Sequence, residues 1–311
     1  MHLLYKLDNL VEGIIIKRPS KYIKTPYVAD VKLLDDNFLI ENEDINKEIN
    51  EEKIETINEE KTKEQNIILG HSASLGCCGL ADVGSHILLG KKQIKEKSKS
   101  KLQCSHVIYL GIVEEKNNRQ LIGIYPKLAE ILTENALKKN LIKSLQNIKS
   151  YRRETKIFVP NKIDSRFDFS GIDENDIPFI MEVKNVPLAN YEDMLPKDLK
   201  KMNFSQREFN SKIAYFPDGY RKKKQDVVSV RALKHIRELT LIKQESITRT
   251  IMCYVIQRDD IDRFTISIID PEYREAVKYS ITQGVEIILL VVKWKENGEA
   301  YLLEKDLQLI L

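Results

Sequence analysis

The pattern near the C-terminal end constrains the fold most. Segments 251–257 and 285–294 have the apolar, β-branched character of strands, and segment 271–282 between them has that of a helix. Residues 287–292 form an unbroken apolar run, which is typical of a strand covered on both faces. A strand, a helix and a strand in succession predict a mixed α/β domain.

Upstream segments extend this pattern. Further strands are predicted at 156–160, 165–169 and 179–186. Apolar residues recur at helical spacing in 127–148 and 229–241. The first of these segments is predicted to be one amphipathic helix or a helix pair, and it opens the second domain.

The N-terminal part of the chain instead has short strand-like runs separated by turns, which predict a small β-barrel. The runs are 13–16, 27–31, 67–69, 86–89, 107–113 and 119–125. The glycine-rich loop 71–79 matches neither GxxxxGK[ST] nor GxGxxG, so a nucleotide-phosphate loop is not supported.

Residues 41–66 are low in complexity and contain ten acidic residues and four lysines, a contribution of −6. We interpret them as a solvated insertion, disordered or loosely helical. Because the whole chain carries +3, the remainder carries +9. Such a basic remainder suits a polyanionic partner, although surface lysines serve solubility equally well.

No segment approaches the roughly 20 apolar residues of a membrane helix, and the N-terminus lacks the apolar stretch of a signal peptide. A cytoplasmic protein without membrane association is therefore expected. The four cysteines, Cys77, Cys78, Cys104 and Cys253, show no CxxC spacing, so neither a disulfide framework nor a zinc ribbon is indicated.

Charged residues that suit catalysis occur on two of the predicted strands. In 165–169, strand parity places Arg166 and Asp168 on one face, while the phenylalanines between and after them face the core. In 179–186 the same parity pairs Glu182 with Lys184. The turn-forming linker 171–178 predicts a hairpin that brings the two charged faces together.

Two carboxylates and a lysine that converge in this way suit phosphodiester hydrolysis. Carboxylate oxygens bind Mg²⁺ or Mn²⁺, which complete their coordination with water and phosphate oxygens. The ion activates water and neutralises charge that develops on phosphate, and the lysine supports either step. From the D-x(13)-E-x-K spacing alone, a hairpin with ordinary surface ion pairs is the better interpretation.

Five ordered blocks change that balance, because together they resemble the signature of the SfsA (sugar fermentation stimulation protein) family. The blocks are 165–169 (SRFDF), 181–188 (MEVKNVPL), 215–218 (YFPD), 231–239 (RALKHIREL) and 284–286 (GVE). The resemblance implies an N-terminal OB-like β-barrel at 1–118, with the acidic insertion at about 41–66. It also implies a PD-(D/E)xK restriction-endonuclease-like α/β domain at 119–311.

The resemblance implies specific roles for residues. Asp168 and Glu182 would hold the metal, Lys184 would complete the catalytic set, and Glu154 would match the family's upstream acidic position. A capping or surface role for Glu154 is equally ordinary. The implied nucleic-acid contacts are Arg166, Arg231, Lys234, His235, Arg18 and Lys21, and Tyr22 and Tyr27 are candidates for base stacking.

The chain departs from the family pattern in places. The loop at 71–78 replaces a Pro-Asn-Thr-Gly type loop, and a family asparagine is replaced around Glu130. The leading hypothesis is a Mg²⁺- or Mn²⁺-dependent nuclease that acts on DNA, with RNA left open. The alternatives are a non-catalytic DNA-binding regulator and an interaction scaffold that uses 41–66. Homo-oligomerisation is also left open.

Overall fold

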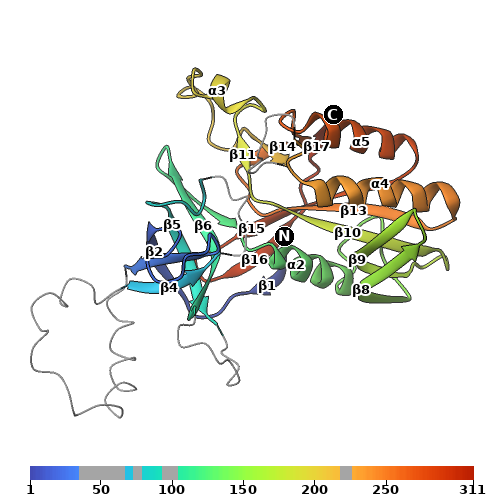
Figure 1. The fold of residues 1–311 in the computed structure, drawn as a ribbon, viewed down its shortest axis with the longest axis horizontal. Coiled ribbons are helices and arrows are strands. Elements are labelled where there is room, and N and C mark those ends of the chain that lie inside the picture. The colour runs from blue at the N-terminus through green and yellow to red at the C-terminus, as the bar shows by residue number, and fades with distance from the viewer. Residues whose placement is uncertain (35–66, 73–78, 93–103, 218–225) are drawn as a thin grey trace, which may run out of the picture.

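The computed structural model describes residues 1–34, 67–72, 79–92, 104–217 and 226–311. The predicted insertion at 41–66 and most of the 71–78 loop lie outside these residues. The described chain forms a six-stranded, a seven-stranded and a four-stranded sheet (Figure 1). Helices lie against the seven-stranded sheet, so the predicted mixed α/β class is confirmed.

The six-stranded sheet contains the N-terminal strands, which confirms the strands predicted there. They are β2 (Leu10–Lys17), β3 (Val28–Leu33), β4 (Ile67–His71), β5 (His86–Lys91), β6 (His106–Glu115) and β7 (Asn118–Gly123), in the order β4-β3-β2-β5-β6-β7. Strand β4 also pairs in parallel with β6, through Gly70 opposite His106 and His71 opposite Val107. The pairings therefore run from β4 through β3, β2, β5 and β6 and return to β4.

The seven-stranded sheet holds most of the C-terminal part. Its order is β1 (His2–Lys6), β16 (Glu299–Leu303), β15 (Glu286–Trp294), β13 (Arg249–Ile256), β10 (Pro178–Val186), β9 (Ile163–Ile172) and β8 (Ser150–Val159). The three central strands β10, β13 and β15 are parallel, and the outer pairings are antiparallel. The strand most completely covered on both faces is β13, in which residues 250–256 are all buried.

Helices cover both faces of this sheet. Along β13, Ile251 and Cys253 pack into the core beside α2 (Lys127–Lys138), whereas Met252 and Tyr254 pack beside α4 (Val230–Glu245) and α5 (Pro271–Thr282). Figure 1 shows α4 and α5 on one side of the sheet and α2 on the other. Of the helix or helix pair predicted over 127–148, only one helix forms, because α2 ends at Lys138 and turns follow it.

A small third sheet was not predicted. It contains β11 (Ala189–Asn190), β12 (Lys212–Phe216), β14 (Ile261–Ile266) and β17 (Gln308–Ile310), and the short α3 (Pro196–Leu199) lies in the connection before β12. The predicted domain boundary at 118–119 stays a prediction. Strand β7, which follows that boundary, belongs to the six-stranded sheet, and β1 belongs to the seven-stranded sheet. Among the described residues, no helix has the length and apolar character needed to cross a membrane.

Candidate functional site

The predicted hairpin forms, and its two strands separate where the acidic residues lie. Strands β9 and β10 pair from Ile172–Pro178 as far as Phe169–Met181. One residue further, Asp168 Oδ2 accepts a hydrogen bond from the backbone N–H of Val183 at 2.7 Å. The carboxylate thus takes the partner's place in the ladder, which satisfies a backbone donor and fixes the side chain.

The separation also changes which way β9 faces. Sequence parity placed Phe167 and Phe169 on one core face, but Phe169 packs in the cluster beside α2 and Phe167 packs in the cluster beside α4. That part of the prediction is wrong. Opposite Asp168 on β8, Glu154 has φ 56°, so the neighbouring strand also leaves regular β geometry at this level.

Asp168, Glu182 and Lys184 line one cavity of about 320 Å³. The walls come from the residues before and within α2, the end of β10, β12 and the start of α4. The other lining residues are Pro126, Ala129, Glu130, Val183, Asn185, Pro187, Leu188, Tyr215, Phe216, Ser229 and Arg231. The structure therefore brings together the three residues that strand parity and the predicted hairpin placed on one charged face.

The two carboxylates of the cavity have opposite protonation tendencies. Burial and the nearby charge of Glu182 raise the pKa of Asp168 to about 7, against the hydrogen bond from Val183 and the charge of Lys184. Burial also favours the neutral form of Glu182, but Lys184 and His235 together hold its pKa below the ordinary value. Near neutral pH, Glu182 is charged and Asp168 is poised to exchange a proton.

The two carboxylate oxygens of Glu182 differ in their hydrogen-bond partners. Its Oε1 accepts a hydrogen bond from Lys184 Nζ at 2.5 Å and lies 2.5 Å from Nδ1 of His235. Its Oε2 is buried and has no hydrogen-bond partner among the described residues. A buried carboxylate oxygen without a donor is costly unless a cation binds it.

The residues of the cavity fit a small divalent cation. No group of three or more His, Cys, Asp or Glu side chains in the described ranges is arranged as a ready metal cluster. Mg²⁺ and similar ions, however, are commonly bound through one or two carboxylates plus water and substrate phosphates. The unpartnered Oε2 of Glu182 and the carboxylate of Asp168 provide this donor set.

The basic residues predicted on α4 separate into two groups. Arg231 lines the cavity next to Ser229, whose side chain caps the helix by accepting from Ala232 N. Lys234 donates to the backbone oxygen of Asp164 at 2.5 Å and does not line the cavity. His235 is only 4% exposed, so in this structure it contacts Glu182 rather than the surface.

Other predicted residues lie away from the cavity lining. Glu154 and Arg166 are both mostly exposed and face each other at 3.6 Å across β8 and β9. Arg18 donates to the backbone oxygens of Pro26 and Ala81, each at 2.8 Å, and so holds its own loop. Their catalytic and nucleic-acid roles stay predictions.

The remaining predicted contacts lie in the same N-terminal loop as Arg18. The ammonium group of Lys21 lies 5.8 Å from the ring centroid of Tyr22. Tyr22 and Tyr27 are exposed, as stacking residues must be.

Glu130 and Asn185 are cavity residues to which sequence reasoning gave no function. Glu130 pairs with Arg153 at 2.7 Å, and its charge adds to the raised pKa of Asp168. The signal for Glu130 was its place in the predicted helix, but nothing in the sequence oriented that helix toward the strands. The signal for Asn185 was its position directly after Lys184. Strand parity, however, places neighbouring side chains on opposite faces, so it did not place Asn185 beside Lys184.

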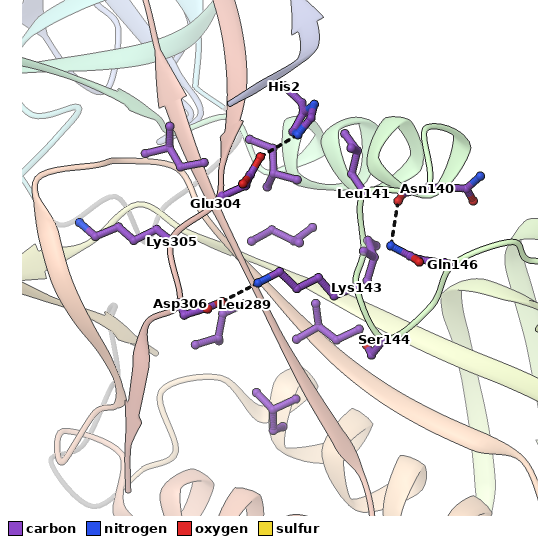
Figure 2. Close-up of a pocket in the computed structure, with 16 residues that line it drawn as sticks. His2, Asn140, Leu141, Lys143, Ser144, Gln146, Leu289, Glu304, Lys305 and Asp306 are labelled. Atoms are coloured by element: carbon purple, nitrogen blue, oxygen red, sulfur yellow. Dashed lines mark hydrogen bonds and ion pairs between the residues drawn. The ribbon is translucent and has the colours of Figure 1, made fainter.

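A second cavity, of about 340 Å³, lies elsewhere, between the segment after α2, β15 and the end of β16. Leucine and isoleucine side chains form much of its lining, and two pairs of polar side chains also line it (Figure 2). Lys143 pairs with Asp306 at 3.0 Å, and His2 contacts Glu304 at 2.9 Å. In this second cavity these polar side chains contact one another. In the cavity around Asp168, by contrast, Glu182 Oε2 has no partner among the described residues, so that cavity is the candidate reaction site.

The C-terminal part of the chain matches a known protein family. The family model SfsA, described as "Sugar fermentation stimulation protein RE domain", matches residues 127–197 and 198–298. These ranges include every residue that lines the cavity around Asp168, which we call the acidic cavity, except Pro126.

Individual proteins are similar over much of the chain. A sugar fermentation stimulation protein homolog of Ruegeria pomeroyi is 28% identical and covers 74% of this chain and 84% of its own. The homolog of Jannaschia sp. is 30% identical and covers 68% of this chain and 71% of its own. The solved structure of Pyrococcus furiosus SfsA in complex with Ca²⁺ has a TM-score of 0.66 at 17% identity over the whole of both chains, so the overall fold is shared.

Proposed function

The chain belongs to the SfsA (sugar fermentation stimulation protein) family, and from this premise we propose that it binds nucleic acid and hydrolyses phosphodiester bonds of DNA with Mg²⁺ or Mn²⁺. The observation that carries the proposal is the buried, unpartnered Oε2 of Glu182 beside the raised-pKa carboxylate of Asp168. RNA remains a second substrate class for the same chemistry.

Each cavity residue has a distinct task in this proposal. Asp168 and Glu182 would hold the cation, which when bound supplies a polarised water and neutralises phosphate charge. Lys184 holds Glu182 ionised and presents positive charge to the phosphate. His235 supports Glu182 from behind and keeps it in place, as an outer-shell partner does for a ligand.

The approach to the cavity also suits a phosphate. Arg231, which lines the cavity, is exposed, and the N-terminus of the 16-residue α4 lies beside it. A helix N-terminus and an arginine both favour an anion. Among the predicted contacts, Arg231 is therefore the residue that we assign to the phosphate nearest the site.

We assign the N-terminal strands to nucleic-acid binding as an OB-like fold. The five strands β2 to β6 pair in a ring, and the parallel β4–β6 pairing is short. A small, partly open five-stranded barrel with exposed aromatics is the arrangement that OB-folds use to bind oligonucleotides. Tyr22, Tyr27 and Lys21 provide this chemistry in the loop after β2.

A cleavage assay tests the proposal. Labelled single- and double-stranded DNA and RNA are incubated with the protein in Mg²⁺, in Mn²⁺ and in EDTA. We expect cleavage only with metal, and a loss of at least a hundredfold in Asp168→Ala, because one of two metal ligands is gone. The matched control is Asp164→Ala, an exposed aspartate on the same strand, which should cleave normally.

The competing function is a regulator that binds DNA without cutting it. The observation in its favour is that no group of three or more His, Cys, Asp or Glu side chains among the described residues is arranged to hold a metal ion. It predicts salt-dependent binding with no turnover in any metal. Absence of cleavage in the wild-type protein, together with such binding, would reject the nuclease and leave the regulator.

A further inference from the structure

A tryptophan behind the acidic cavity sets the direction of a buried hydrogen-bonded chain. Nε1 of Trp294 donates to Oε1 of Gln257 at 3.1 Å, and both side chains are buried. An indole nitrogen is a donor only, so the oxygen of the Gln257 amide must face it. The usual ambiguity between the two ends of a glutamine amide is thereby removed.

The direction passes on to Asn185 at the cavity wall. With its oxygen committed to Trp294, Gln257 presents Nε2 to Asn185, and this nitrogen lies 2.5 Å from Asn185 Oδ1. The oxygen of Asn185 is therefore turned inward, and its Nδ2 is the end left for other partners. The acceptor for Nδ2 within the described ranges is the backbone oxygen of Gly123, at the long distance of 3.5 Å.

The main chain and the neighbouring sheet hold Gln257 in place. Its N–H donates to Val186 O at 3.1 Å, and its carbonyl accepts from Gly123 N at 3.0 Å. A Cβ at Gly123 would lie 1.8 Å from Gln257 Oε1 and 2.8 Å from Trp294 Nε1. The glycine of the six-stranded sheet thus leaves the space that this side chain fills.

We propose that Asn185 contacts the substrate, donating an Nδ2 N–H to a phosphate oxygen of nucleic acid, and that Gln257 is the positioning residue that keeps this donor end outward. The inference rests on the proposed function. Asp168, Glu182 and Glu130 give the cavity wall three carboxylates, which repel a phosphate. A neutral donor with a fixed direction lets phosphate oxygens approach that wall without adding a charge that would compete for the cation.

Binding of a short labelled DNA in EDTA, measured by fluorescence anisotropy, tests the donor separately from cleavage. Asn185→Ala should weaken binding about tenfold, as expected for a hydrogen bond to a charged acceptor. Asn185→Asp should weaken it further, because a carboxylate repels phosphate. Asn175→Ala, in an exposed turn, is the matched control and should bind like wild type.

Variants behind the cavity test positioning. Gln257→Glu still accepts from Trp294, but the introduced carboxylate turns the Asn185 amide so that its oxygen faces the substrate. Binding should fall about tenfold although Asn185 is intact. Trp294→Phe removes the donor that sets the direction and should weaken binding about threefold; it carries the test if Gln257→Glu fails to fold.

A double-mutant cycle separates positioning from general damage. When Asn185→Ala is present, Gln257→Glu or Trp294→Phe should weaken binding little further, because the amide that they orient is gone. In Mg²⁺, Asn185→Ala should raise KM with little change in kcat. Wild-type-like binding by Asn185→Ala, or additive effects in the cycle, would overturn the inference.

The same measurements keep the two proposals apart. Binding that depends on Asn185 without metal-dependent cleavage would reject the nuclease and keep the contact. Metal-dependent cleavage that is unchanged in Asn185→Ala would keep the nuclease and reject the contact. A wild-type protein that binds no nucleic acid would reject both.

Discussion

At the scale of single residues, the candidate site lowers the stability of the folded protein, because it holds a buried carboxylate next to another one. Asp168 is mostly buried beside Glu182, and its pKa is raised from 3.8 to about 7. Such a group favours the folded state when protonated and opposes it when ionised. Functional sites commonly hold carboxylates in this unfavourable state.

This has a pH dependence of definite sign. Between about pH 4 and 7 the folded protein holds a proton at Asp168 that the unfolded chain releases, so unfolding free energy falls as pH rises through this window. Asp168→Asn removes the effect. In EDTA at pH 8 the variant should be more stable than wild type by roughly 1–4 kcal/mol, and near pH 4 the difference should largely vanish.

Urea unfolding at both pH values measures this difference. Asp164→Asn serves as the control, because the Asp164 side chain is mostly exposed and pairs with the exposed Lys156 at 3.4 Å. An Asp168→Asn variant that is less stable than wild type at pH 8 would contradict the raised pKa.

At the scale of elements, the site depends on where two strands stop pairing and on what packs behind them. Strand β7 approaches the end of β13 so closely that a Cβ at position 123 would displace the side chain of Gln257 or Trp294. The contact holds Gln257 and, through it, the end of β10. Substitutions here should affect stability and the site together.

Gly123→Ala is the direct test of this contact. The added methyl group must displace Gln257 or Trp294, and overpacking of this kind costs about 1–3 kcal/mol. Thermal unfolding measures the loss. Gly90→Ala in β5 is the control, since its Cβ would lie 3.1 Å from the ring edge of Tyr109 and should be better tolerated. Equal losses in the two variants would contradict the close approach.

Element-level prediction from sequence succeeded where the pattern was long and periodic. The strands at 179–186 and 285–294, helices α4 and α5 and the hairpin that carries Asp168 and Glu182 were all predicted. The helical prediction over 127–148 ran past the real end of α2. Leu141 and Leu145 continue the apolar spacing, but they lie in turns and pack against the core from there. The short strands of the third sheet carried too few residues to show a period.

The site could be predicted only in part, because several contacts depend on tertiary packing. His235 was predicted to contact nucleic acid together with Arg231 and Lys234, yet it lies on the buried side of α4 against Glu182. Phe167 and Phe169 pack on opposite sides of the sheet, and this depends on where the β9–β10 ladder ends. Neither fact follows from local spacing.

At the scale of the whole molecule, buried charges tie the sheets together. Lys212 of β12 is 4% exposed and contacts Asp260 at 2.9 Å and Glu115 of β6 at 3.1 Å. Burial favours the neutral form of Glu115, but Tyr191 and Lys212 hold its pKa below the ordinary value. The network joins the six-stranded sheet to the small sheet that borders the cavity.

Lys212→Met should therefore destabilise the protein by about 3 kcal/mol, because removing one member leaves the buried carboxylate of Asp260 and the half-buried carboxylate of Glu115 without full compensation. Chemical denaturation at neutral pH measures it. Lys201→Met, which loses only an exposed pair with Asp198, should change stability by less than about 1 kcal/mol. A loss no larger than the control's would show that Arg258 alone satisfies Asp260.

The pairing of β1 with β16 has a consequence for how the protein is made. His2 lies opposite Leu302 in the finished sheet, so β1 meets its partner only after the segments between the two strands have been synthesised. The N-terminal ring of strands, by contrast, has all its partners long before that. The sheet that carries Asp168 is therefore completed only after the N-terminal ring of strands has all its partners, and the acidic cavity is assembled later than that ring.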